Sequence, residues 1–269
     1  MTTISGSARR AGRVAVVSGS TGGIGAAICL QLAADGMRVI MLGRSADKLR
    51  HAKGRILAAL DLAPQLSVQT VDIADTESVT LAVEDIYQLV GHVDLLVHAA
   101  GDGPVAALLD TTEAMWQASV QSKMMGTIRL TKEVASRMVR HRSGQIVLIN
   151  GTFSQEPDPT FNVNSTINCA LAGFAKASAR DLGRSGVRVN VVNPGITETS
   201  LWTQTAEDLA TRFNTTAREI NDALLAKIPL RRFATPADVA AIVAFLDSDA
   251  AVYLNGVTIA VDGGMTAAV

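Results

Sequence analysis

The chain has 269 residues, 48% of them hydrophobic, and its formal net charge is −1. This balance excludes a general electrostatic attraction for nucleic acid or for an acidic membrane surface, so neither is an expected partner. The two cysteines show neither metal-ligand nor disulfide spacing, and no apolar run reaches membrane-spanning length. We therefore expect a cytoplasmic protein without a metal site, long enough for one large α/β domain.

Residues 1–12 are polar and include Arg9 and Arg10, so they predict a disordered arm. They contain no apolar core of the kind that a signal peptide needs. The rest of the chain, residues 13–269, is predicted to form a single domain.

The stretch 14–25 reads Val-Ala-Val-Val-Ser-Gly-Ser-Thr-Gly-Gly-Ile-Gly and predicts a buried strand, a glycine turn and the beginning of a helix. Glycine permits a positive φ and lets backbone N–H groups come close to a ligand. The helix that follows would present unpaired N–H groups and its positive dipole end to an anion. This order of elements predicts a dinucleotide pyrophosphate site, with candidate residues Gly19, Thr21, Gly23, Ile24 and Gly25.

Residues 38–42 predict the second strand, which is followed by Gly43-Arg44-Ser45. At this point of a dinucleotide fold an acid would bind the ribose 2′-hydroxyl, whereas a basic residue would accept a 2′-phosphate. The acid is missing and Arg44 is present, which favours NADP over NAD. The alternative is that Arg44 is a solvated surface charge.

The remaining predicted elements alternate along the chain. Helices are expected over about 46–60, 77–90, 112–140 and 162–182, with another beginning at Thr235-Pro236, and strands over 66–71, 93–97, 145–149, 187–192 and 258–261. This alternation predicts a doubly wound parallel sheet, whose ligands bind at the carboxyl ends of the strands.

Three polar residues follow predicted strands without belonging to a recognisable motif. We interpret His98 as a strand-end histidine rather than as a catalyst. Asp102 and Asp158 are possible acids beside the pocket, although each is typical of a turn.

Residues 200–230 contain two helix-like stretches, with Trp202 and Phe213, and no strand pattern. A long excursion beside the carboxyl end of a strand is typical of a lid over a substrate pocket. An oligomer contact is the alternative. For this segment we expect an apolar or neutral substrate.

Six short motifs are spread over nearly the whole chain: Ser18-Gly19-x-x-x-Gly23-Ile24-Gly25, Asp72-Ile73, Ala99-Ala100-Gly101, Asn193-Pro194-Gly195-x-x-x-Thr199, Arg231-Arg232-Phe233-Ala234-Thr235-Pro236 and Val261-Asp262-Gly263-Gly264. Together they resemble the short-chain dehydrogenase/reductase (SDR) family. The resemblance implies a single Rossmann-type α/β domain with a seven-stranded parallel sheet. It also implies dimers or tetramers, formed through the two long helices and the C-terminal segment.

The resemblance also implies further cofactor-binding residues. These are Asp72 and Ile73 at the adenine, Ala99, Ala100 and Gly101 where the cofactor lies on the backbone, and Pro194, Gly195, Ile196 and Thr199 at the nicotinamide end.

The family's reaction uses an asparagine, a serine, a tyrosine and a lysine, and the motifs imply where each should stand. Those positions hold Lys123, Gly151, Asn164 and Asn168. Gly151 and Asn164 have the family's usual separation, so the alignment has not slipped. Asparagine has no proton to give near neutral pH, so the family's ordinary proton relay cannot be carried over. Thr152 could replace the serine only through a local bend, because successive strand residues point to opposite faces.

Relative to the family, the lysine and the asparagine look exchanged between the two long helices. Lys123 would then deliver its ammonium from the opposite wall of the site, where it could hold the cofactor or the substrate, or donate a proton. The alternative is that Lys123 only fills a polar gap in an inactive site.

Three functions remain open. The first is an NADP-dependent oxidoreductase with a non-standard relay, acting on a small-molecule carbonyl compound or alcohol. The second is a nucleotide-binding pseudoenzyme or sensor, and the third is a non-redox lyase or isomerase. We place the oxidoreductase first, because the glycine turn and the nicotinamide-end motif are both present.

Overall fold

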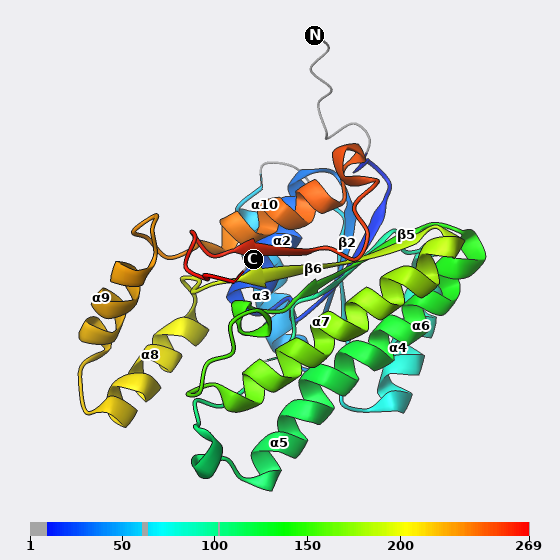
Figure 1. Cartoon of the computed structure of the whole chain (residues 1–269). Coiled ribbons are helices and arrows are strands. Elements are labelled where there is room, and N and C mark those ends of the chain that lie inside the picture. The colour runs from blue at the N-terminus through cyan, green and yellow to red at the C-terminus, as the bar shows by residue number, and fades with distance from the viewer. Residues whose placement is uncertain (1–9, 61–63, 102, 269) are drawn as a thin grey trace.

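A sheet of seven parallel strands forms the centre of the protein, which a computed structural model describes over residues 10–60, 64–101 and 103–268 (Figure 1). The strands lie in the order β3-β2-β1-β4-β5-β6-β7. They are β1 (Val14–Ser18), β2 (Arg38–Gly43), β3 (Leu66–Thr70), β4 (Leu95–His98), β5 (Gly144–Ile149), β6 (Val187–Pro194) and β7 (Thr258–Val261). The predicted doubly wound parallel sheet is confirmed.

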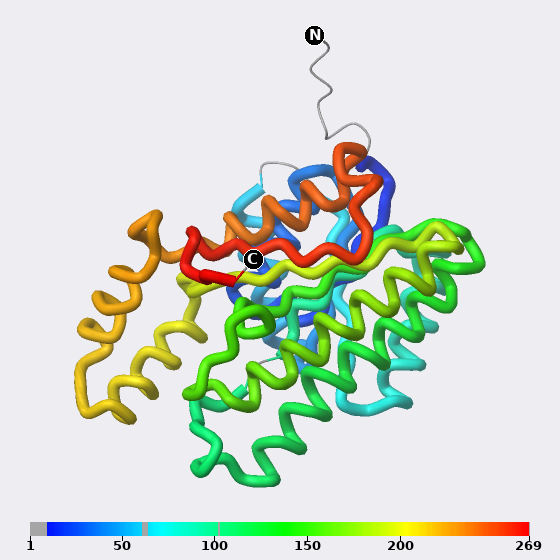
Figure 2. Tube along the Cα trace, in the orientation of Figure 1, coloured from blue at the N-terminus to red at the C-terminus, as the bar shows by residue number. Residues whose placement is uncertain are grey.

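Helices cover both faces of the sheet, as a parallel sheet requires. One face carries α2 (Gly23–Ala34), α3 (Ala46–Ala58) and α10 (Pro236–Leu246), and the other carries α4 (Thr76–Val90), α6 (Gly126–His141) and α7 (Asn162–Leu182) (Figures 1 and 2). Alternate residues of β1 show why both faces are buried. Val14 and Val16 belong to the core beneath α4, α6 and α7, whereas Ala15 and Val17 belong to the core beneath α2, α3 and α10.

Two further helices, α8 (Ser200–Phe213) and α9 (Ala217–Lys227), stand away from these layers at the end of the sheet where β6 terminates (Figure 1). They confirm the two helical stretches expected within residues 200–230. Short 3-10 turns complete the fold: η1 (Leu108–Asp110), η3 (Thr152–Ser154), η4 (Gly183–Ser185) and η5 (Asp249–Ala251). None of the helices in the described ranges is long and apolar enough to cross a bilayer.

The first of the two long predicted helices is not continuous. Thr112 caps it as expected, but it consists of α5 (Glu113–Ser119), a π-helical turn η2 (Val120–Met125) and then α6. Hydrophobic periodicity does not reveal this wider turn, because Val120 and Met124 keep a four-residue spacing and pack against α7.

A cluster of charges lies at the amino-terminal ends of the strands. The side chain of Asp247, which follows α10, is 0% exposed and accepts a hydrogen bond from Arg13 Nη1 at 2.8 Å. Arg10 Nε lies 3.6 Å from the same carboxylate, and Arg10 also pairs with Asp35. This cluster joins the beginning of the chain to α2 and to the end of α10.

The predicted disordered arm therefore does not extend to Arg10. This residue is 9% exposed, because its guanidinium is held by the carboxylates of Asp35 and Asp247. Residues 1–9 of the predicted arm lie outside the described residues.

Replacing Asp247 by alanine leaves two guanidinium groups without their buried partner, and we expect the free energy of unfolding to fall by about 3–5 kcal/mol. The matched control is Asp47→Ala, which removes an exposed partner of Arg50 and costs at most about 1 kcal/mol. Urea unfolding of the three proteins measures the difference. Equal losses in the two variants would contradict the assignment of Asp247 as the centre of the cluster.

Candidate functional site

The glycine turn after β1 packs against the turn after β4, where the strand order reverses. Gly19 has a φ of +67°, and a Cβ built on it would lie 2.4 Å from the carbonyl oxygen of Ala99. A Cβ on Gly25 would lie 2.2 Å from the carbonyl oxygen of Gly19. A side chain at either position would displace backbone, so only glycine fits. The turn thus lies in the crevice where doubly wound sheets bind ligands.

Helix α2 begins at this turn without a side-chain cap, because its N-cap residue is Gly22. The N–H groups of its first turn therefore have no side-chain acceptor, and they carry the positive end of the helix dipole. An anion such as a pyrophosphate would supply the missing acceptors. Of the other residues predicted here, Ile24 packs on the core beneath α2 and α10, and Thr21 lines an adjoining pocket.

The segment that follows β6 lies beside the glycine turn, although the two are far apart in the chain. A Cβ on Gly23 would lie 2.6 Å from Cγ2 of Thr199, and one on Gly195 would lie 2.8 Å from Cβ of Asp262. Thr199 also caps α8 with its side chain. The structure therefore brings to the glycine turn the segment that contains the predicted residues Gly195, Ile196 and Thr199, which directly follows Pro194 at the end of β6.

Asp72 and Ile73, which the family pattern places at the adenine, follow β3 at the same edge of the sheet. Asp72 is exposed, and its Oδ1 accepts a hydrogen bond from the backbone N–H of Ala74 at 3.0 Å. Ile73 packs closely on Gly126, where a Cβ would lie 2.8 Å from Ile73 Cγ1. Both side chains are thus held in place by local contacts.

A pocket of about 460 Å³ lies between the glycine turn and α3, and its lining includes four ionisable residues, Asp47, Lys48, His51 and Arg55. Arg44 directly follows β2 and is exposed, but it does not line this pocket. The sequence analysis missed this basic face of α3. The signal was present, because Lys48, His51 and Arg55 follow one another at intervals of three and four residues, which places them on one side of a helix.

Lys123 lies in the π-helical turn η2 and is 6% exposed. Its aliphatic stem passes next to Gly101, whose φ is +114°, and a Cβ on that glycine would lie 2.6 Å from Lys123 Cγ. Turns of this type occur frequently at functional sites. The structure thus directs a buried lysine to the turn after β4.

Asn164 and Asn168 lie one helical turn apart on α7 and are 7% and 2% exposed. Asn164 Nδ2 donates a hydrogen bond to the carbonyl oxygen of Gly103 at 3.2 Å. Gly151 faces Asn168, because a Cβ on Gly151 would lie 2.9 Å from Asn168 Nδ2. The four positions predicted from the family pattern therefore converge: Lys123 and Asn164 reach the same turn from two helices, and the other two contact each other.

The other polar candidates have structural partners. His98 Nε2 lies 2.9 Å from Thr131 Oγ1, and burial lowers the pKa of His98 to about 3, so the ring is neutral at physiological pH. Asp158 Oδ1 accepts a hydrogen bond from the backbone of Thr160 at 2.7 Å, as a turn residue does. Asp102 lies outside the described residues.

Neither tyrosine of the chain lies at this site. Tyr87 stacks against Arg137, and burial raises its pKa to about 12. Tyr253 is 99% exposed. Thr152, a possible replacement for the serine, is buried at the first position of η3.

Asn193 lies near the carboxyl end of β6, and the sequence analysis gave this residue no role. Its Nδ2 donates to Ser154 Oγ at 2.7 Å and to Gln155 Oε1 at 3.0 Å, while its Oδ1 accepts from the N–H of Gly151 at 3.2 Å. It thereby fastens the segment after β5 to the end of β6. Its place directly before Pro194 in the fourth motif was the available signal.

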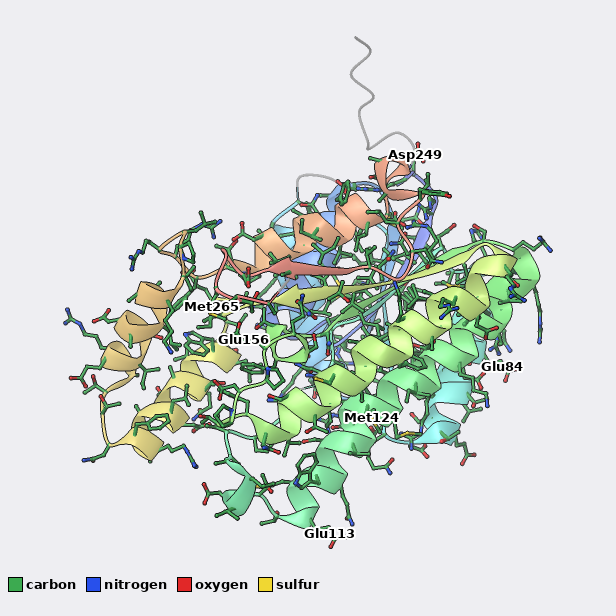
Figure 3. All side chains as sticks on the ribbon, viewed as in Figure 1. Glu84, Glu113, Met124, Glu156, Asp249 and Met265 are labelled. Carbon is green, nitrogen blue, oxygen red and sulfur yellow. The ribbon has the colours of Figure 1, made fainter. Side chains whose placement is uncertain are left out.

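The C-terminal segment, which contains Met265, lies near Glu156 in the segment after β5 (Figure 3). The backbone N–H of Ala267 donates to Glu156 Oε2 at 3.0 Å, and Thr266 Oγ1 donates to Asp262 Oδ2 at 2.6 Å. The first contact holds the segment after β7 next to the segment after β5, and the second lies within the segment after β7. Within the described ranges, no group of three or more His, Cys, Asp or Glu side chains could hold a metal ion.

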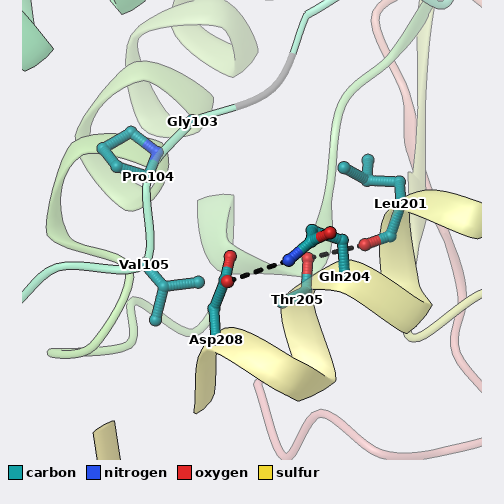
Figure 4. A pocket seen from close by; sticks show the side chains of 7 residues that line it. All are labelled: Gly103, Pro104, Val105, Leu201, Gln204, Thr205 and Asp208. Carbon is teal, nitrogen blue, oxygen red and sulfur yellow. Dashed lines mark hydrogen bonds between the residues drawn. The ribbon is translucent and has the colours of Figure 1, made fainter. Parts of the chain in front are cut away.

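A second pocket, of about 360 Å³, opens between the segment after β4 and α8 (Figure 4). Its lining consists of Gly103, Pro104, Val105, Leu201, Gln204, Thr205 and Asp208. Arg212 of α8 pairs with Asp110 of η1 at 2.6 Å and joins the two walls. The carbonyl oxygen of Gly103 is the one that Asn164 binds, so this pocket adjoins the four converging positions.

Comparison with known sequences finds reductases that are similar to this chain over most of its length. A family model described as enoyl-(acyl carrier protein) reductase matches residues 19–266. The 3-oxoacyl-[acyl-carrier-protein] reductase FabG of Aquifex aeolicus is 32% identical over 258 residues, which are 94% of this chain and 97% of the relative. The acetoacetyl-CoA reductase of Allochromatium vinosum is 28% identical over 256 residues, 94% of this chain and 98% of the relative.

Solved structures agree with the fold. An actinorhodin polyketide ketoreductase with NADPH superposes with a TM-score of 0.90 at 28% identity, over 94% of this chain and 97% of the other. The L-sorbose reductase of Gluconobacter frateurii, complexed with NADPH and L-sorbose, gives 0.88 at 28% identity, over 96% and 98% of the two chains.

The neutral, buried ring of His98 predicts that the protein loses stability in acid. The unfolded chain binds a proton at this histidine below about pH 6.5, whereas the folded protein does so only near pH 3, so stability falls as the pH drops between these values. Between about pH 7.5 and about pH 5 the loss from this residue is about 2 kcal/mol. Urea unfolding at the two pH values measures it.

His98→Gln keeps a polar side chain opposite Thr131 and should remove this part of the pH dependence. The control is Thr131→Val, which removes the partner of His98 Nε2 and keeps the buried histidine, so the pH dependence should persist. An identical pH dependence in wild type and His98→Gln would contradict the assignment.

Proposed function

Because the chain belongs to the short-chain dehydrogenase/reductase family, we propose that it is an NADP-dependent oxidoreductase that interconverts a small carbonyl compound and an alcohol. The observation that carries the proposal is the glycine turn: Gly19 and Gly25 are packed so closely that no side chain fits, and α2 begins there without a side-chain cap. The ketoreductase and the L-sorbose reductase that share the fold at 28% identity were both solved with NADPH, which supports the choice of cofactor.

The residues present fit a nicotinamide dinucleotide. The first turn of α2 offers N–H donors for the pyrophosphate, and the segment around Thr199 lies against Gly23 for the nicotinamide end. Arg44 is exposed directly after β2, where a basic side chain would accept the 2′-phosphate. The basic face of α3, with Lys48 and Arg55, supplies further positive charge next to the glycine turn.

A bound nicotinamide supplies hydride transfer, so the chain itself has to supply a proton for the substrate oxygen. Gly151, Asn164 and Asn168 have none to give. Lys123 is the member of the four positions that carries a transferable proton, and its burial against Gly101 holds it at the carboxyl ends of the strands. We assign it as the proton donor in reduction.

The pocket between Gly103 and α8 is assigned to the substrate. Its apolar wall of Pro104, Val105 and Leu201 fits a neutral compound, and its position makes α8 and α9 the substrate lid expected for residues 200–230. Association into dimers or tetramers, as the family resemblance implies, is part of the proposal.

One observation favours a second candidate, a nucleotide-binding protein without redox turnover. The amides of Asn164 and Asn168 are buried at the two α7 positions where the family has tyrosine and lysine, and neither can transfer a proton. Such a protein would bind the nucleotide but would not catalyse hydride transfer to a substrate. Turnover by the wild-type protein separates the two candidates.

Nucleotide binding is tested by following nicotinamide fluorescence during titration with NADPH and with NADH. We expect NADPH to bind at least about tenfold more tightly, because its 2′-phosphate meets Arg44, and Arg44→Glu to remove most of this preference. The control is Arg38→Glu, at the opposite end of β2. Absence of binding by either nucleotide to the wild-type protein overturns the proposed function.

The role of Lys123 is tested with Lys123→Met, which keeps the buried stem and removes the ammonium. In NADPH-dependent reduction of a carbonyl panel, we expect kcat to fall by roughly 10²–10⁴-fold while the Kd for NADPH stays within about threefold. Lys132→Met, at an exposed position on α6, is the matched control. Unchanged kcat in Lys123→Met would exclude Lys123 as proton donor, and NADPH binding without any wild-type turnover would favour the second candidate.

A further inference from the structure

The guanidinium group of Arg129 binds three different parts of the chain. Arg129 lies in the first turn of α6 and is half-buried. Its Nε donates to Thr76 Oγ1 at 3.1 Å, and its Nη1 donates to the carbonyl oxygens of Ile73 at 3.4 Å and Gln121 at 3.2 Å. Its Nη2 donates to Gln121 Oε1 at 2.7 Å. One side chain thus joins the π-helical turn η2 to the segment after β3 and to the beginning of α4.

The wide turn of η2 sets the direction of Lys123. In an α-helix, successive residues are about 100° apart around the axis, so Lys123 would lie about 60° from Val120. A π-helical turn contains more residues, which lowers the angle per residue and moves Lys123 further from Val120 around the axis. Val120 and Met124 stay on one side of the helix, where they pack against α7. The wide turn therefore lets Lys123 reach Gly101 while its neighbours remain in the core at α7.

Two side chains donate hydrogen bonds to main-chain carbonyl groups at this turn. Ser122 Oγ donates to the carbonyl oxygen of Ala118 at 2.7 Å, and Arg129 Nη1 donates to that of Gln121. Side chains that insert into the main-chain hydrogen bonds of a helix are a known cause of its distortion. Ser122 binds only within its own helix, whereas Arg129 connects the turn to another element. Arg129 is therefore the contact that can fix the turn in space.

The segment that Arg129 binds is itself held firmly next to α6. Asp75 caps α4, because its Oδ2 accepts a hydrogen bond from the N–H of Ser78 at 2.8 Å. Ser78 Oγ in turn accepts a hydrogen bond from the N–H of Asp72 at 3.0 Å. Ile73 packs so closely on Gly126 that a Cβ there would lie 2.8 Å from Ile73 Cγ1. Helix α4 also lies beside α6 (Figure 1). Arg129 thus ties η2 to a fixed support.

We propose that Arg129 is a positioning residue, which holds η2 in its π-helical form and so keeps Lys123 buried against Gly101. It does this by fastening Gln121 to the beginning of α4. Without the guanidinium group, the turn is released toward α-helical spacing and Lys123 loses its contact with Gly101. The consequence for catalysis rests on the proposed function, whereas the consequence for the place of Lys123 does not.

The first experiment measures the accessibility of Lys123 by brief acetylation with acetic anhydride and mass spectrometry of the peptides. Lys132, which is exposed on α6, is the reference within each protein. In Arg129→Ala we expect acetylation of Lys123 relative to Lys132 to rise at least about tenfold, because several hydrogen bonds from a charged group are lost. The matched control is Arg137→Ala, which removes another half-buried arginine of α6, one that pairs with Glu133, and should leave the ratio within about twofold of wild type.

Two further measurements separate positioning from a general loss of stability. Guanidinium chloride well below its denaturing concentration should restore the protection of Lys123 in Arg129→Ala, whereas the same concentration of sodium chloride should not. Thr76→Val removes one exposed partner of Arg129 and should raise the acetylation ratio by about threefold. This second variant tests the proposal even where Arg129→Ala does not fold.

The activity experiment asks whether Arg129 acts through Lys123. In NADPH-dependent reduction, Arg129→Ala should lower kcat by roughly 10–100-fold and leave the KM for the carbonyl compound within about threefold, because the proton donor is displaced and the pocket beside α8 is not changed. In a Lys123→Met background, the same substitution should lower kcat by less than about twofold, because the ammonium group that Arg129 positions is already absent.

The proposal is overturned if Arg129→Ala and Thr76→Val both leave the acetylation ratio within about twofold of wild type. An equal loss of kcat in the wild-type and Lys123→Met backgrounds also contradicts it. Failure of the proposed function looks different. Unchanged kcat in Lys123→Met, or a wild-type protein without turnover, contradicts the proposed reaction, while the acetylation ratio still decides whether Arg129 positions Lys123.

Discussion

The close approach of two backbones at the centre of the sheet controls the rest of the structure. Gly19 and Ala99 follow neighbouring parallel strands, and a Cβ on Gly19 would lie 2.4 Å from the Ala99 carbonyl oxygen. The approach closes the crevice from beneath and leaves the first turn of α2 facing it. The turn after β4 then continues to Gly101 and Gly103, which contact Lys123 and Asn164. One turn therefore borders both the proposed cofactor groove and the four positions proposed for the reaction.

The two halves of the site depend on different kinds of constraint. The cofactor half is made of backbone geometry, in which a positive φ at Gly19 and glycines at tight contacts leave little choice of residue. The proposed reaction half is made of side chains on η2 and α7, where Lys123, Asn164 and Asn168 are buried. These positions have helical backbone, which restricts the choice of residue less than the positive φ of Gly19 does.

Much of the fold and part of the candidate site were predictable from the sequence, for physical reasons that differ between elements. The strand–turn–helix order around Gly19 is local, and so are the caps at Thr112 and Thr235, so periodicity and turn chemistry were sufficient. The π-helical turn around Lys123 was not predictable, because the apolar spacing on its buried face is that of an ordinary helix. The packing of Arg10 depends on Asp247, at the other end of the chain, and no local pattern reveals such a contact.

The proposed exchange of lysine and asparagine between the two long helices has a consequence for any reaction at this site. Lys123 on η2 and Asn164 on α7 both reach the turn that contains Gly101 and Gly103. In the proposed reaction, Asn164 and Asn168 cannot move a proton near neutral pH, because an amide neither releases nor removes one there. Proton movement then has to occur on η2, at Lys123. The proposed proton donor would thus stand on a different helix from the one that the family resemblance implies.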